Sequence, residues 1–251
     1  DKIRDFRRFG ASMVFQNFGL MPHRTVLENG MYGLNIQGVT SGEAEKRTKH
    51  WLNRVGLSGF EDRYPGQLSG GMQQRVGLAR ALATDADILL MDEAFSALDP
   101  LIRADMQAIL LDLQDELHKT IVFITHDLDE ALRIGDDIAI LRDGELIQKG
   151  SPQNIVLKPA DDYVADFTKD VNRARVLTLN ILSHEAGSKE GLALDGDLPI
   201  EQAMQQMVDS KYNLVTVMKD NKPIGQVSLR DMVGAISRPK TTESGSTKTY
   251  R

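Results

Sequence analysis

Short apolar runs alternate with stretches of helical spacing along this chain. Apolar runs at residues 11–16, 88–91 and 120–125 predict three short strands. The runs at residues 88–91 and 120–125 are nearly continuous, which is typical of parallel strands that are covered on both faces. Residues 101–118 lie between the second and third runs and predict a helix, which makes a strand–helix–strand unit. The pattern therefore predicts an α/β fold built on a parallel sheet.

Two further helical regions precede the second strand. Residues 26–57 have mainly helical spacing, with a break near residues 38–42, and Ser41 is placed to cap the helix after the break. A Pro-Gly break then leads to Ser69, which predicts the start of a helix that ends near Thr84. These helices form a separate lobe at about residues 17–84.

The second half of the chain begins with a hairpin pattern. Residues 136–150 alternate in polarity and contain Asp143-Gly144, a sequence that favours a tight hairpin turn. Pro152 suits the first turn of the helix that follows. Residues 198–236 predict a helix, a strand, a turn, a second strand and a second helix.

The charge balance changes near residue 170. There are 19 basic and 27 acidic residues up to Asp170, but 11 basic and 9 acidic residues from Val171 onwards. We therefore predict one domain over residues 1–170 and a smaller α+β domain over residues 171–238. Residues 239–251 are rich in Ser, Thr and Lys and predict a disordered tail.

Composition excludes several classes of function. The 251 residues are 41% hydrophobic and 26% charged, as in ordinary globular domains. The net charge of −6 argues against nucleic acid as a partner, because that binding requires a cationic face. The absence of cysteine excludes disulfides and thiolate metal sites. No apolar run approaches the roughly 18 residues that a spanning helix needs.

Polar side chains follow each of the predicted parallel strands. Gln16, the pair Asp92-Glu93 and His126 all fall at or just beyond the end of an apolar run. Since ligands of α/β sheets bind beyond the carboxyl ends of the strands, these four residues predict a phosphoryl-transfer site. The alternative is that each merely ends a strand, which is the commoner case for any one of them.

A glycine-rich helix start lies at residues 68–75, which read Leu-Ser-Gly-Gly-Met-Gln-Gln-Arg. Small residues allow close backbone approach, and the N-terminus of a helix favours phosphate. The alternative interpretation is an ordinary glycine-rich cap.

The glycine-rich stretch at residues 68–75, followed by the strand and carboxylates at residues 88–93, resembles the ABC ATPases, a branch of the P-loop NTPases. The resemblance identifies residues 68–75 as the signature motif and residues 88–93 as the Walker B strand. It implies ATP and Mg²⁺ as cofactors, with Asp92 at the metal and Glu93 as the general base. It also implies that His126 touches the γ-phosphate and that Gln16 contacts Mg²⁺ or water.

The resemblance also implies an assembly. In the family, the signature motif completes the nucleotide site of the opposite subunit, so Ser69, Gly70 and Gly71 would bind ATP across a homodimer. Asp99 resembles a residue of that interface. No stretch matches G-x-x-x-x-G-K-[ST], the family's phosphate-binding loop, and the chain opens at Asp1 without an initiator Met. We expect an N-terminally truncated ATPase, which alone binds ATP weakly and is inactive.

Two features indicate one subfamily of the ABC ATPases: the sequence of residues 92–103 and the C-terminal domain. Both resemble the ATPase subunit of glycine betaine/proline (quaternary-amine) importers. That type implies a membrane permease subunit, a periplasmic or lipid-anchored substrate-binding protein as an indirect partner, and a peripheral place on the cytoplasmic face of the cell membrane. An importer for another small solute remains an alternative.

Residues 217–231 resemble a CBS module, of which only one unit is visible. In the betaine importers this region is regulatory. A passive dimerisation domain is the alternative for the region. A catalytically silent, CBS-bearing nucleotide-binding protein is the alternative for the whole chain.

Overall fold

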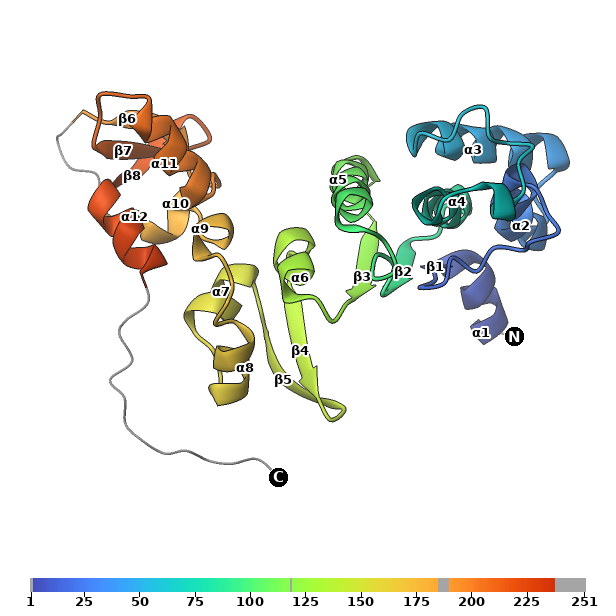
Figure 1. Ribbon diagram of the computed structural model, residues 1–251, viewed down its shortest axis with the longest axis horizontal. Helices are drawn as coiled ribbons and strands as arrows, with labels where there is room; N and C mark the ends of the chain where they lie inside the picture. Colours follow the sequence, from blue (N-terminus) through green and yellow to red (C-terminus); the bar gives the residue numbers. More distant parts are fainter. Residues whose placement is uncertain (1, 118, 185–189, 238–251) are drawn as a thin grey trace. The chain divides into compact units, whose positions relative to one another are not determined.

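A computed structural model of the chain describes residues 2–117, 119–184 and 190–237 (Figure 1). The chain divides into two compact units, Asp1–Gly135 and Asp136–Arg251. Each unit has its own cluster of buried apolar side chains. The domain boundary at residue 170 stays a prediction, and the tail predicted at residues 239–251 lies outside the described residues.

A parallel three-stranded sheet lies in the first unit. Its strands are β1 (Ala11–Val14), β2 (Ile88–Asp92) and β3 (Thr120–Ile124), in the order β1-β2-β3. The register pairs Asp92 at the end of β2 with Ile124 at the end of β3. All three strands therefore run in the same direction and end at one edge of the sheet, as the apolar runs predict.

The expectation that both faces of the strands are covered is wrong for β3. Leu89 and Met91 on β2 are buried, but the side chains of Val122 and Ile124 on β3 are 47% and 56% exposed. Burial alternates along β3, with exposed residues at every second position. The described residues cover one face of this strand, and the apolar character of the other face is the reason why the sequence suggests full burial.

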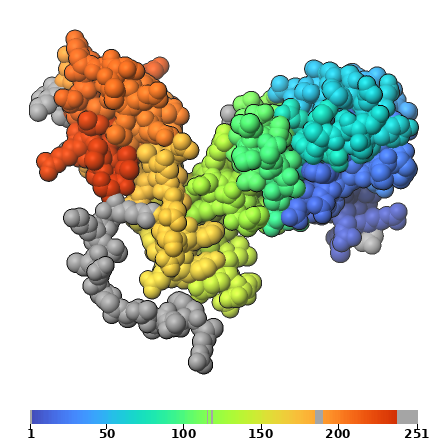
Figure 2. Space-filling view, viewed as in Figure 1, coloured from blue at the N-terminus to red at the C-terminus, as the bar shows by residue number. Residues whose placement is uncertain are grey.

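Three helices form a lobe beside the sheet: α2 (Val26–Gln37), α3 (Ser41–Arg54) and α4 (Gly70–Ala83). They pack against one another in all three pairs, and α3 and α4 appear as one cyan-to-teal body in Figure 2. Thr40 is the N-cap residue of α3, with no capping hydrogen bond from its side chain. The predicted cap at Ser41 is therefore wrong by one residue.

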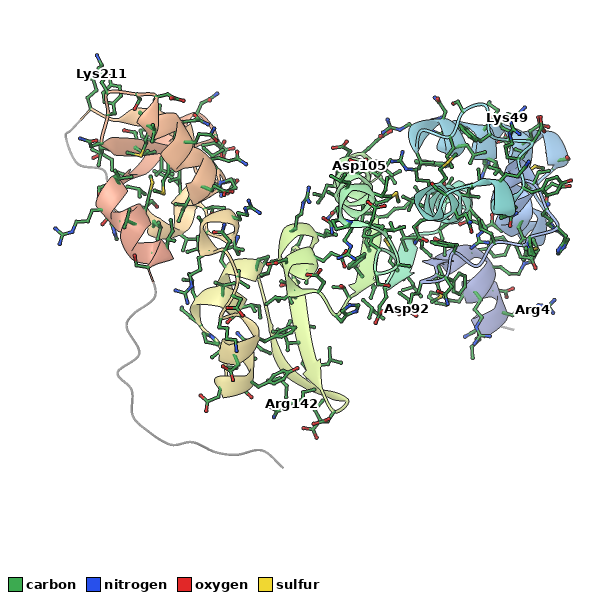
Figure 3. The ribbon with its side chains drawn as sticks, viewed as in Figure 1. Arg4, Lys49, Asp92, Asp105, Arg142 and Lys211 are labelled. Atoms are coloured by element: carbon green, nitrogen blue, oxygen red, sulfur yellow. The ribbon has the colours of Figure 1, made fainter. Side chains whose placement is uncertain are left out.

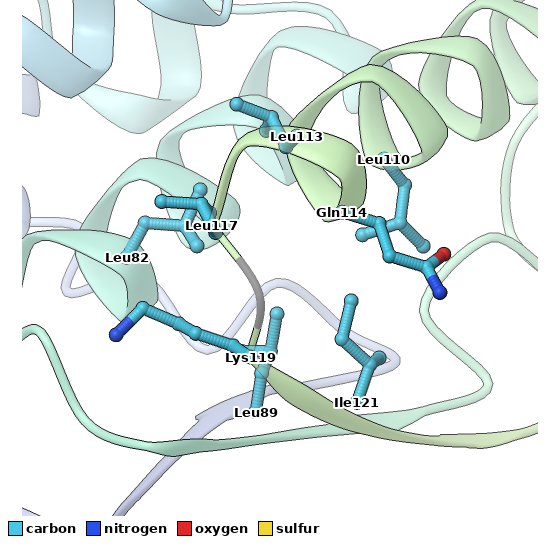
Figure 4. A pocket seen from close by; sticks show the side chains of 8 residues that line it. All are labelled: Leu82, Leu89, Leu110, Leu113, Gln114, Leu117, Lys119 and Ile121. Carbon is cyan, nitrogen blue, oxygen red and sulfur yellow. The ribbon is translucent and has the colours of Figure 1, made fainter.

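Helix α5 (Pro100–Leu117) connects β2 to β3 and packs on the apolar core of the unit. A small cavity of about 10 Å³ lies between this helix, α4 and the strands, with room for about one water molecule. Its lining is almost entirely apolar, so it is a packing gap in the core (Figure 4). The lining residues are Leu82, Leu89, Leu110, Leu113, Gln114, Leu117, Lys119 and Ile121.

The second unit contains a hairpin and a three-stranded sheet. The hairpin joins β4 (Ile138–Arg142) to β5 (Glu145–Gly150) through Asp143 and Gly144, whose φ angles of +53° and +82° give the predicted tight turn. In the sheet, β7 (Leu214–Lys219) pairs in parallel with β6 (Leu192–Asp195) and antiparallel with β8 (Lys222–Ser228).

Two amphipathic helices flank the second sheet in sequence: α11 (Ile200–Val208) and α12 (Leu229–Ile236). Met207 and Met232 on these helices belong to the core of this unit, together with Val215 on β7. The predicted helix–strand–turn–strand–helix order over residues 198–236 is confirmed. The remaining elements are α1 (Lys2–Asp5), η1 (Phe6–Gly10), η2 (Pro65–Gln67), α6 (Leu128–Ile134), α7 (Pro152–Leu157), α8 (Asp162–Phe167), α9 (Arg173–Val176) and α10 (Leu179–Leu182).

Candidate functional site

Gln16 follows β1 by two residues and reaches across to the end of the neighbouring strand. Its Nε2 donates to Glu93 Oε2 at 2.8 Å and to Ser96 Oγ at 3.3 Å. Ser96 Oγ in turn donates to the backbone oxygen of Glu93 at 2.9 Å. A small hydrogen-bonded ring therefore holds Gln16 against the turn that follows β2.

Asp92 is the last residue of β2 and Glu93 follows it directly, and Figure 3 shows Asp92 at the tip of this strand. Glu93 has a φ of +41°, in a region that residues other than glycine seldom adopt and that costs about 1 kcal/mol or more. Its backbone N–H donates to the oxygen of Ile124 at 2.9 Å, which ties this turn to the end of β3. The turn directs the carboxylate of Glu93 toward the residues that follow the other two strands.

His126 follows β3 by two residues. Its Nδ1 lies 3.5 Å from Glu93 Oε2, within reach of an ion pair whenever the imidazole is protonated. The His126 side chain is 70% exposed, whereas that of Glu93 is 31% exposed. The same carboxylate oxygen is thus approached by Gln16, which follows β1, and by His126, which follows β3, the two strands that flank β2.

A buried arginine supports the loop that carries Gln16. Arg80 on α4 is 8% exposed, and its guanidinium donates to the oxygens of Gly19 at 2.7 Å and Phe18 at 3.1 Å. Phe18 and Gly19 both have positive φ angles, of +59° and +56°. Burial lowers the pKa of Arg80. The signature helix and the loop after Gln16 are therefore bound together by one side chain.

The predicted signature motif begins helix α4. Ser69 is its N-cap residue, and its Oγ accepts the backbone N–H of Met72 at 3.3 Å. Gly70 is exposed, so the first turn of the helix is open to an anion. Gly71 is buried, and a Cβ atom there would lie 2.3 Å from Cγ2 of Ile102 on α5. The two glycines therefore have different surroundings.

Asp99 directly precedes helix α5. Its Oδ1 accepts the backbone N–H groups of Leu101 at 3.2 Å and of Ile102 at 3.1 Å. Pro100 holds the first helical position, where its missing N–H costs nothing. In this structure Asp99 acts as a helix cap.

The predicted site residues fall into two groups. Gln16 and His126 each contact Glu93, and Asp92 is the last residue of β2, directly before Glu93. Among the described residues, the contacts of Gln16, Glu93 and His126 do not include the second group, which consists of Ser69, Gly70, Gly71 and Asp99.

The donor set suits a magnesium ion that is held mainly by phosphate and water. In the described part of the chain, no cluster of three or more His, Asp or Glu side chains could hold a metal by itself. Mg²⁺ is commonly bound by one or two protein oxygens, with waters and substrate phosphates as its other ligands. The Asp92 carboxylate and the Gln16 amide oxygen are suitable ligands of that kind.

Three supporting residues are not evident from the strand and helix pattern: Arg80, Arg103 and Glu130. Arg80 could be found as the lone charge in the apolar helical stretch at residues 76–83. Arg103 and Glu130 act through contacts with residues distant in sequence, at separations of 24 and 23 positions. No local pattern indicates such partners.

Comparison with known proteins agrees with this site. The ABC transporter family matches residues 1–96, and the CBS domain family matches residues 188–238. The glycine betaine transport ATP-binding protein OpuAA of Bacillus subtilis (strain 168) is 61% identical over 178 residues, which are 71% of this chain and 43% of that protein. The glycine betaine/carnitine transport ATP-binding protein GbuA of Listeria monocytogenes is 54% identical over 89% of this chain and 55% of that protein.

The match to a third relative covers a larger share of that protein's length. The trimethylamine N-oxide transport system ATP-binding protein TmoW of Ruegeria pomeroyi is 45% identical over 92% of this chain and 67% of that protein. The chain thus spans between 43% and 67% of the length of these three relatives.

A solved structure supports the fold. The ATP-binding cassette MJ0796, in a dimeric post-hydrolysis state bound to ADP and Pi, matches with a TM-score of 0.54 and 36% identity. The match covers 61% of this chain and 67% of that one. Within the described residues, no helix is both long and apolar enough to cross a membrane. On the similarity of its sequence and its fold, this chain belongs to the family of ABC transporter ATP-binding proteins and carries a CBS domain.

Proposed function

We propose that this chain is part of the ATP-hydrolysing subunit of an importer for glycine betaine or a related quaternary amine. The observation that carries the proposal is its 61% identity to a glycine betaine transport ATP-binding protein. The contact of Gln16, Glu93 and His126 at the ends of three parallel strands supports the hydrolytic part of it. A silent nucleotide-binding protein would not require this arrangement.

Glu93 is the general base in this proposal. Gln16 and His126 both approach its Oε2, so we assign Oε1 to the attacking water. A carboxylate held from two sides and strained at its backbone is fixed in one orientation, which favours proton transfer from a positioned water. The proton of the water passes to Glu93 as the water oxygen bonds to the γ-phosphorus of ATP. The bond between that phosphorus and the β–γ bridging oxygen breaks, and ADP leaves with the bridging oxygen.

His126 and Asp92 have separate roles. The exposed imidazole of His126 is suited to donate to the γ-phosphate while its Nδ1 faces Glu93. Asp92 and Gln16 would hold Mg²⁺, which would neutralise charge on the phosphates. These assignments make the edge formed by the ends of β1, β2 and β3 the place where ATP is bound.

The second group of residues would act on the ATP of another copy. Gly70 is exposed at the N-terminus of a 14-residue helix, and Ser69 caps that helix. These residues and Gly71 would bind phosphate across a homodimer, with Asp99 at the same interface. The dimeric state of the matched ADP-bound cassette supports this arrangement.

Membrane subunits and a substrate-binding protein would complete the importer. The ATPase would lie peripherally on the cytoplasmic face of the membrane and contact a permease, whereas the substrate-binding protein would be an indirect partner. The CBS-like region would regulate transport. The chain has one Trp and five Tyr residues, which are scattered, so we place recognition of the quaternary amine in the partner proteins.

An uptake experiment tests the transported solute. A bacterial strain without glycine betaine uptake is supplied with the full-length gene and the genes of its membrane partners. We expect uptake of radiolabelled glycine betaine with the wild-type gene, loss with Glu93→Gln, and no loss with the exposed control Glu145→Gln. Uptake of trimethylamine N-oxide or of an unrelated solute, without glycine betaine, would contradict the proposed substrate.

A further inference from the structure

Arg103 lies in the first turn of α5 and contacts two separate segments. Its Nη2 lies 3.4 Å from the backbone oxygen of Ser96 and 3.3 Å from that of Leu98, as a donor to both. Its Nη1 donates to Asp127 Oδ2 at 3.4 Å. The side chain is 29% exposed, so water screens these contacts only in part. One guanidinium therefore joins the segment after β2 to the segment after β3.

Asp127 connects Arg103 to residues on both sides of His126. It follows His126 directly, and its other carboxylate oxygen, Oδ1, accepts the backbone N–H of Glu130 at 3.3 Å as the cap of α6. Its own backbone N–H donates to Thr125 Oγ1 at 3.0 Å. The position of Asp127 thus determines the direction in which the chain passes through His126.

A second contact fixes the same segment one helical turn further along α5. Gln107 donates through Nε2 to Glu130 Oε1 at 3.0 Å, and Thr125 Oγ1 donates to Glu130 Oε2 at 2.6 Å. Gln107 and Glu130 are 6% and 5% exposed. This buried pair anchors α6 to α5. Arg103 adds contacts with the backbone oxygens of Ser96 and Leu98, which the buried pair does not make.

We propose that Arg103 is a positioning residue that holds residues 96–99 and residues 125–127 as one unit. The proposal rests on the proposed function, in which His126 belongs to the ATP site of its own chain and Asp99 lies at the interface with a second copy. A displacement of residues 96–99 by the second copy would then move Asp127 and, with it, His126. Arg103 would in this way make hydrolysis at one site depend on the partner subunit.

Two substitutions separate the contacts of Arg103. Arg103→Gln removes the ion pair and weakens the contacts with the two backbone oxygens. Asp127→Asn removes the negative charge that faces Arg103 but keeps an oxygen that can cap α6. Arg54→Gln is the matched control, since Arg54 also forms an ion pair with α5, through Glu116, in a different part of the unit.

The first measurement is amide hydrogen exchange in the full-length gene product, which requires no activity. We expect Arg103→Gln to speed exchange about fivefold or more in both residues 96–99 and residues 125–127, because both segments lose the same support. Arg54→Gln should leave both segments unchanged. Faster exchange in only one segment, or in neither, would overturn the link.

The second measurement is ATP turnover by the same variants. We expect kcat to fall about tenfold in Arg103→Gln and less in Asp127→Asn, with KM for ATP within about twofold of the wild type, because a misplaced His126 impairs the reaction more than binding. The double variant should be no slower than Arg103→Gln alone. A wild-type protein without ATPase activity would contradict the proposed function, whereas an active wild type with unchanged kcat in Arg103→Gln would overturn the role of Arg103.

Discussion

Gly71 provides a sharp test of how the signature helix packs on α5. In Gly71→Ala, the new Cβ would lie 2.3 Å from Cγ2 of Ile102, far inside the contact distance of about 3.5–4 Å. Isoleucine is branched at Cβ and cannot turn this methyl group away without a change of rotamer. Such overpacking costs about 1–3 kcal/mol, and the gain in helix propensity returns about 1 kcal/mol. The free energy of unfolding should therefore fall by up to about 2 kcal/mol.

Gly70 is the matched control, because it is the neighbouring residue of the same helix. A Cβ on Gly70 would meet only Cζ of Phe18, at the ordinary distance of 3.5 Å. Gly70→Ala should therefore stabilise the unit by about 0.5–1 kcal/mol. Urea unfolding followed by tryptophan fluorescence measures both variants, since the single Trp of the chain, Trp51, packs against the core of this unit.

A compensating substitution separates the steric clash from other effects. Ile102→Ala removes the methyl group that the new Cβ would meet, at a cost of about 2–4 kcal/mol by itself. The double variant Gly71→Ala/Ile102→Ala should be more stable than the sum of the two single changes predicts, by about 1–2 kcal/mol. Strictly additive changes, or equal stabilities of Gly71→Ala and Gly70→Ala, would refute the close packing of α4 on α5.

Two further predictions concern charged side chains. Arg80→Met should lower the free energy of unfolding by about 2–4 kcal/mol in the same fluorescence assay, because it leaves the oxygens of Phe18 and Gly19 without their donor; a loss below about 0.5 kcal/mol would contradict this role. The Ser228 hydroxyl and backbone N–H lower the pKa of Asp231 below its ordinary value of about 3.9. Because the folded-state pKa is lowered, its stabilising effect is present above about pH 4 and disappears as the pH falls through the folded-state pKa. Thermal unfolding by circular dichroism should therefore show Asp231→Asn less stable than the wild type at pH 5, with a smaller difference at pH 3; a difference that does not change with pH would contradict the assignment.

The strands and the residues that follow them are predictable because local pattern and topology agree. The runs at residues 88–91 and 120–125 are apolar enough to indicate strands, and the helix between them makes the strands parallel. Parallel strands end at the same edge, so Glu93 and His126 must lie near each other. The sequence also places Gln16 at this edge, but its contact with Glu93 requires that β1 lies next to β2, which the structure shows.

The supporting contacts are not predictable in this way. Arg103 and Asp127 are 24 residues apart, and their contact depends on the place of α5 beside the end of β3. The exposure of Val122 and Ile124 depends on what packs against that face of the sheet, which no pattern within the strand reveals. The N-cap of α3 is predicted one residue too late, at Ser41. Thr40 beside it has a similar side chain, so the sequence does not distinguish the two, and the structure places the cap at Thr40.

The most direct test of the account is ATP turnover by the full-length gene product and its Glu93→Gln variant. The wild type should hydrolyse ATP only when Mg²⁺ is present. Glu93→Gln should bind ATP and form a dimer but show no turnover, since its amide cannot take a proton from water. Hydrolysis by Glu93→Gln at the wild-type rate would contradict the central claim that Glu93 is the base of an ABC ATPase.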